Sequence, residues 1–142
     1  MSAIYTGKCV CEGIRFSIST KPALVLACSC THCQKGAGGP SSVMGFFAED
    51  SIDVLSGKDL ISTYVITNTD SGKPKDKMFC KVCGVTVWTS PFIAKERKQL
   101  LVRTAVLDGY GPELKPTVEV YTKGKPTWAT AVEGAAQHEH SL

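Results

Sequence analysis

The sequence lacks any long hydrophobic run and carries little net charge. None of its 142 residues lie in a segment that approaches the roughly 18 consecutive apolar residues of a membrane helix. Sixteen basic and thirteen acidic side chains leave a formal charge of +3, which is too small and too dispersed to indicate a nucleic-acid partner. We therefore expect neither a membrane nor a nucleic acid among the partners.

The sequence also lacks a secretory signal and any sign of a domain boundary. Its first residues, MSAIYTGKC, show no charged region followed by an apolar stretch, so we expect a cytosolic or nuclear protein. No repeat, low-complexity tract or linker divides the chain, and its length suits one domain. We expect a single domain over residues 1–142, with a core over about 5–133 and a flexible tail over 134–142.

Helical periodicity is scarce, whereas short segments rich in β-branched and aromatic residues recur between turn signals. These segments lie at 13–20, 23–28, 42–48, 51–57, 60–67, 85–90, 99–108 and 117–124. Residues 70–77, DSGKPKDK, have the composition of a loop. The weak helix candidates are residues 91–100 and the stretch after Cys33. The pattern predicts an all-β fold.

The chain is unusually rich in cysteine. There are seven cysteines, and an odd number in a compartment that keeps thiols reduced argues against a disulfide framework. They fall into three groups: CVC at 9–11, CSCTHC at 28–33 and CKVC at 80–83. Cysteines at such short spacings can turn their sulfurs onto one zinc ion. The spacing therefore predicts that thiolates bind metal here.

Two partitions of the thiols fit these spacings. In the favoured one, a closed site (the first cluster) consists of Cys9, Cys11, Cys80 and Cys83, and an open site (the second cluster) consists of Cys28, Cys30 and Cys33. Three ligands with an open fourth position are typical of catalytic zinc. In the alternative, a zinc ribbon joins Cys30 and Cys33 to Cys80 and Cys83. A further alternative is that the cysteines bind an iron–sulfur cluster or no metal at all.

Four segments together resemble one known family. They are GKCVCEGIRFSI (7–18), CSCTHCQKGAG (28–38), FCKVCG (79–84) and VLDGYGPELKPTVEVYTKGKPTW (106–128). They are similar to the glutathione-dependent formaldehyde-activating enzyme family, which includes centromere protein V. The resemblance implies an Mss4-like (β-tent) fold of short antiparallel sheets with two zinc ions. One zinc would be structural, at the first cluster, and the other labile, at the second.

The activity that the resemblance implies is that of a carbon–sulfur lyase. Such an enzyme joins glutathione reversibly to formaldehyde as S-(hydroxymethyl)glutathione, so the partners would be a small thiol and an aldehyde. Cys28, Cys30 and Cys33 would act in catalysis as ligands of the open zinc. The alternative is a non-catalytic zinc module that mediates protein or chromatin interactions. An open thiolate set favours the enzyme, because a scaffold has no need of one. The sequence does not indicate the oligomeric state.

The glycine-rich segment after Cys33 is a candidate for binding the thiol substrate. Glutathione is anionic, so a basic side chain and free backbone amides would help to hold it. Lys35, Gly36 and Gly38 can supply these groups.

The chain departs from the family pattern at three positions, although every zinc ligand is kept. Ser29 and Glu119 stand where many members carry histidine, and Gln34 stands where an arginine is common. These departures leave the thiol and the aldehyde unidentified.

Overall fold

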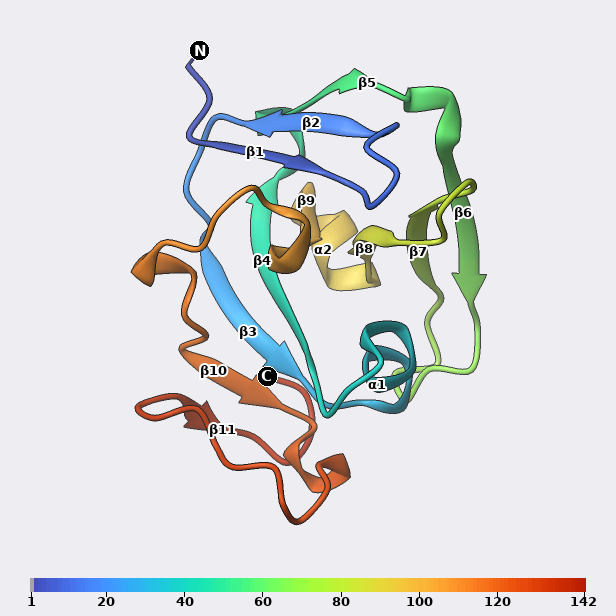
Figure 1. Ribbon diagram of the computed structural model, residues 1–142. Helices are drawn as coiled ribbons and strands as arrows, with labels where there is room; N and C mark the ends of the chain where they lie inside the picture. The colour runs from blue at the N-terminus through green and yellow to red at the C-terminus, as the bar shows by residue number, and fades with distance from the viewer. Residues whose placement is uncertain (1) are drawn as a thin grey trace.

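The computed structural model describes residues 2–142 and consists mostly of β-structure (Figure 1). The strands are β1 (Tyr5–Lys8), β2 (Arg15–Ile18), β3 (Leu24–Cys28), β4 (Ser42–Ala48), β5 (Ile52–Ser56), β6 (Ile61–Ile66), β7 (Lys75–Cys80), β8 (Thr86–Ser90), β9 (Gln99–Arg103), β10 (Val118–Val120) and β11 (Ala136–Gln137). The α-helices are α1 (Thr31–Ala37) and α2 (Phe92–Glu96), and the 3-10 turns are η1 (Glu49–Ser51), η2 (Lys58–Leu60), η3 (Thr104–Val106), η4 (Pro112–Leu114) and η5 (Thr122–Gly124). Across residues 2–142, no helix has the length and apolar character needed to span a membrane.

The strands of residues 2–142 form two sheets. The small sheet has the order β1-β2-β5, and the large sheet has the order β11-β10-β3-β4-β9-β8-β7-β6. In Figure 1 the small sheet crosses the upper end of the large one, and β10 and β11 lie at the opposite end. Most pairings are antiparallel, but β10 pairs parallel with both β3 and β11. The expectation of antiparallel sheets is wrong at this edge, because β10 reaches β3 by a long connection and not through a hairpin.

The large sheet buries side chains on both faces because successive residues of a strand point to opposite sides. Phe47 packs toward the small sheet in a core that also contains Phe16 and Trp88, whose rings meet edge to face at 5.3 Å between centroids. Its neighbour Phe46 packs on the opposite face with Leu101. Cys28 and Cys33 belong to this second core. The second cluster therefore sits on the face of the large sheet that turns away from the small sheet.

Three strands differ from the sequence-based expectation. β1 was not among the predicted segments, and β7 begins at Lys75 inside the predicted loop 70–77. The tail expected to be flexible over 134–142 contains β11, and the Tyr121 N–H donates to the His140 carbonyl at 2.9 Å. These segments contain many polar or basic side chains and therefore lack the alternation of apolar residues that predicts a strand. Backbone hydrogen bonds hold them in the structure. α2 lies within the weak helix candidate 91–100, and α1 overlaps the other candidate but begins earlier, at Thr31, so that it includes Cys33.

Two candidate metal centres

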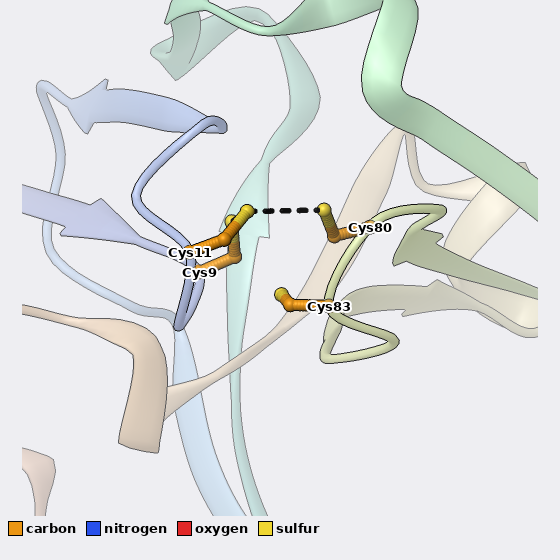
Figure 2. Close-up of side chains that lie close together, drawn as sticks. All are labelled: Cys9, Cys11, Cys80 and Cys83. Carbon is orange, nitrogen blue, oxygen red and sulfur yellow. Dashed lines mark hydrogen bonds between the residues drawn. The ribbon is translucent and has the colours of Figure 1, made fainter.

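The first cluster joins two turns that are far apart in the sequence (Figure 2). Cys9 and Cys11 lie between β1 and β2, Cys80 ends β7, and Cys83 lies in the turn that leads to β8. The Cys11 Sγ lies 3.6 Å from the Cys9 Sγ and 3.7 Å from the Cys80 Sγ, and all four sulfurs lie within 4.8 Å of one another. Sulfurs at zinc-bond length around a tetrahedral ion are about 3.8 Å apart. The first cluster therefore has the dimensions of a closed four-thiolate site.

Backbone groups donate hydrogen bonds to sulfurs of the first cluster. The Ile14 N–H donates to the Cys9 Sγ at 3.4 Å. Burial opposes ionisation of Cys83, but hydrogen bonds from backbone groups of Val85 and Cys11 outweigh it and lower the pKa of Cys83 to about 6. Gly84 has a φ of 78°, a left-handed conformation that suits glycine, and it turns the chain directly after Cys83.

The second cluster is built within six residues. Cys28 ends β3, Cys30 is the N-cap of α1, and Cys33 lies inside α1. Their sulfurs lie within 4.8 Å of one another, and the Cys33 N–H donates to the Cys30 Sγ at 3.4 Å. Hydrogen bonds with the thiols of Cys28 and Cys33 lower the pKa of Cys30 below its usual range. Cys28 and Cys33 are buried, and Cys30 is half-buried.

All seven cysteines are free thiols, and each belongs to one of the two clusters. Cys30 and Cys80, which a zinc ribbon would bring together, lie in different clusters. The geometry therefore gives the four-plus-three grouping. The all-sulfur donor sets fit a soft or borderline ion such as zinc.

Arg103 lies beside the second cluster, and the sequence-based prediction missed it. It ends β9, pairs with Met44 across the sheet, and is 8% exposed. Its guanidinium lies against α1: a Cβ added at Gly36 would be 2.9 Å from the Arg103 Nη2. Burial lowers the pKa of Arg103, while the nearby thiols of the second cluster act to raise it. The sequence feature that could have indicated Arg103 is a single arginine at the end of an otherwise apolar strand.

A cavity of about 800 Å³ lies between the two clusters. Its lining includes Cys83 of the first cluster, Arg103, and Gly36 near the end of α1. Tyr110 and Lys115, from the loop that precedes β10, line it as well. The lining found among residues 2–142 does not include the second cluster's sulfurs, so Arg103 and α1 separate them from this space.

Of the three residues predicted to bind the thiol substrate, Gly36 lines the cavity, and Lys35 and Gly38 are not part of its lining. Lys35 is exposed on the last turn of α1, and Gly38 ends the helix at a φ of 71°, with its N–H donating to the Gln34 carbonyl at 2.8 Å. The Gln34 Nε2 donates to the carbonyls of Pro40 and Gly124, at 3.2 and 2.8 Å. Gln34 thus ties the glycine-rich segment to the turn η5.

Glu119 is turned away from the second cluster. The register pairs Glu119 with Ala27 and Val120 with Cys28, so the side chains of Glu119 and Cys28 point to opposite faces. The Glu119 carboxylate is 2% exposed and accepts hydrogen bonds from Lys125 Nζ at 2.8 Å, the Val132 N–H at 2.7 Å and Gln137 Nε2 at 2.8 Å. It holds the C-terminal segment against β10.

Ser29 is buried next to β10 and η5. It is 1% exposed, and its N–H donates to the Val120 carbonyl at 3.1 Å. A Cβ added at Gly124 would be 2.9 Å from the Ser29 carbonyl oxygen. The position after Cys28 is thus packed under η5, with no room for a larger neighbour at residue 124.

Comparisons with known proteins place the chain in a family. The model of the glutathione-dependent formaldehyde-activating enzyme family matches residues 4–124. A comparison with curated proteins gave no match. A crystal structure of a Rhodobacter sphaeroides protein, a structural-genomics target, shares the fold: its TM-score is 0.57 at 17% identity, over 75% of this chain and 91% of that chain. Since the family match covers most of the sequence, the chain belongs to the glutathione-dependent formaldehyde-activating enzyme family.

Proposed function

We propose that this protein is a zinc-dependent carbon–sulfur lyase that acts on the thiol adduct of a small aldehyde, in the manner of an S-(hydroxymethyl)glutathione synthase. The observation that carries the proposal is the second cluster, in which three thiols from six residues converge. A zinc ion held by three protein ligands would keep a fourth position for a substrate. Membership of a family described as an enzyme family supports it. We also propose that the fold is Mss4-like, as the family membership implies.

The first cluster would hold a structural zinc. Its four thiols complete a tetrahedral set, and they connect the turn after β1 to the turn after β7. A closed set of four thiolates leaves no position for a substrate. Its role is to hold the small sheet against the large one.

The second cluster would take the substrate sulfur. Zinc bound by Cys28, Cys30 and Cys33 would supply a soft acceptor with one exchangeable position. Three thiolates would leave such a unit with a net charge of −1. A cation beside the cluster, such as Arg103, would favour the arrival of a further thiolate.

The reaction is balanced without another reactant. The thiol sulfur forms a bond to the aldehyde carbon, the carbonyl double bond becomes a single bond, and the oxygen takes the proton that the thiol has lost. In reverse, the hydroxyl of the adduct loses its proton and the carbon–sulfur bond breaks. The chain has to orient two small molecules, so positioning is its main contribution.

Exchange NMR with ¹³C-formaldehyde and glutathione tests this function, because it measures the rate of adduct formation and breakdown at equilibrium. The zinc-loaded protein should accelerate exchange above the uncatalysed rate, and Cys30→Ser should abolish the acceleration. Thr31→Ser, an exposed change on the same helix, is the matched control. No acceleration by the zinc-loaded wild type would contradict the proposal and favour a non-catalytic zinc module.

A further inference from the structure

We propose that the cavity between the two clusters is an anion site that binds a carboxylate of the thiol substrate, with Arg103 as its main binding residue and Lys115 at its rim. The inference rests on the proposed function for the identity of the substrate, and it narrows the substrate class to thiols that carry a carboxylate.

The first support is the state of Arg103. The side chain is 8% exposed, and its Nε is buried without a hydrogen-bond partner among residues 2–142. The ion pairs of these residues join Lys8 to Asp108, Arg15 to Glu12, Lys95 to Asp76 and Lys125 to Glu119, so none involves Arg103. Burying a charge is costly unless it is paired, and a guanidinium offers five donors in a planar fork. Arg103 therefore has unused capacity for an anion.

The second support is the charge of the cavity. Arg103 and Lys115 line it, and no aspartate or glutamate occurs in its lining among the described residues. Hydroxyl groups of Ser42, Thr86 and Tyr110 add neutral donors. The volume of about 800 Å³ is that of a small-molecule site. A carboxylate fits this chemistry because it pairs with a guanidinium through two parallel hydrogen bonds.

The third support is the position of the cavity relative to the second cluster. Arg103 ends β9 on the sheet face that carries Cys28, and its guanidinium lies against Gly36, three residues after Cys33. A carboxylate held by Arg103 would therefore lie beside α1, the helix that contains Cys33. A neutral thiol would lack this attachment.

The competing role for Arg103 is that of a counter-charge to the thiolates of the second cluster. The two roles predict different results. A counter-charge would affect how tightly the second cluster holds zinc, whereas an anion site affects the affinity for carboxylates even when the ligand has no thiol.

Isothermal titration calorimetry of the zinc-loaded full chain separates these roles. The probes are S-methylglutathione, which has carboxylates but no free thiol, and its diethyl ester, which has neither. Wild type should bind the acid and not the ester. Arg103→Gln should weaken acid binding by about tenfold or more, Arg103→Lys should weaken it less, and the exposed change Lys115→Gln should weaken it by about twofold.

Equal binding of acid and ester by the wild type would overturn the proposal without any mutation, so it stays testable if Arg103→Gln fails to fold. Unchanged acid affinity in Arg103→Gln, with loss of the second zinc, would also overturn it in favour of the counter-charge. Arg103-dependent acid binding in a protein that does not accelerate adduct exchange would support the anion site and contradict the proposed function alone.

Discussion

Cys11 and Cys80 are 69 positions apart in the sequence, and their Sγ atoms lie 3.7 Å apart. One belongs to the turn after β1 in the small sheet, and the other ends β7 in the large sheet (Figure 2). A metal at this point would close a long loop, and closing a long loop removes more entropy from the unfolded chain than closing a short one. The second cluster spans six residues, so its metal would constrain little of the chain.

Cys80→Ser should therefore destabilise the protein far more than Cys30→Ser. A structural zinc contributes its binding free energy to folding, so we expect the first variant to lower the melting temperature by about 10 °C or more, or to abolish soluble expression. Cys30→Ser should stay within about 5 °C of the wild type, because its cluster cross-links so short a segment. Calorimetry of both variants in one buffer gives the comparison. Equal losses would contradict the separate roles of the two clusters.

Gly57→Ala should destabilise the first cluster through the backbone that carries it. Gly57 has a φ of 76°, and an added Cβ would collide with the backbone of Gly13, in the turn that holds Cys9 and Cys11. Gly72→Ala is the matched control, because Gly72 has a φ of 73° and nothing lies within 4 Å of the added Cβ.

Both glycine variants carry the left-handed strain of about 1 kcal/mol, and Gly57→Ala should cost at least about 2 kcal/mol more. Denaturant titration measures the difference in the free energy of unfolding. Equal costs for the two variants would show that the turn after β1 can shift without loss.

Glu119→Gln should destabilise the protein in a pH-dependent way. Burial acts to raise the pKa of Glu119, but the hydrogen bonds from Lys125, Gln137 and the Val132 N–H outweigh it, so the pKa is lowered. A carboxyl whose pKa is lower in the folded state stabilises the protein above its unfolded pKa, and this contribution is lost as the pH falls through the folded pKa.

The loss of the Glu119 charge should lower the free energy of unfolding by about 2 kcal/mol at pH 7, because Lys125 would keep a buried charge without its partner. The difference between wild type and Glu119→Gln in the free energy of unfolding should shrink as the pH is lowered below the ordinary range of glutamate. Glu133→Gln, an exposed change on the same segment, is the control. A difference that does not depend on pH would contradict the buried ion pair as its source.

Much of the sheet could be predicted from the sequence because apolar alternation marks strands that bury one face or both. The segments at 42–48 and 23–28 became β4 and β3 with nearly the expected bounds. β11 could not be found in this way, since it buries little and joins the sheet through its backbone. The parallel pairing of β10 also has no local signal, because strand order depends on long-range packing.

The cysteine grouping could be favoured from spacing but not decided by it. The sulfurs of Cys9 and Cys80 meet only because the small sheet is folded against the large one, and no local pattern records that contact. Arg103 was missed for the same reason: its importance comes from Gly36 on α1, which lies far away in the sequence. Glu119, which stands where many family members carry histidine, faces away from Cys28, and this orientation also depends on the register between β10 and β3.

The most direct test of the account is the zinc content of the native protein, measured by native mass spectrometry with and without glutathione. Zinc-loaded wild type should carry two ions. A mild chelator should remove one of them selectively, or glutathione should bind to that ion as a ternary complex. Cys30→Ser should carry one ion, which resists the chelator. Equal lability of both ions in the wild type, or the same zinc content in Cys30→Ser as in wild type, would contradict a closed structural site beside an open reactive one.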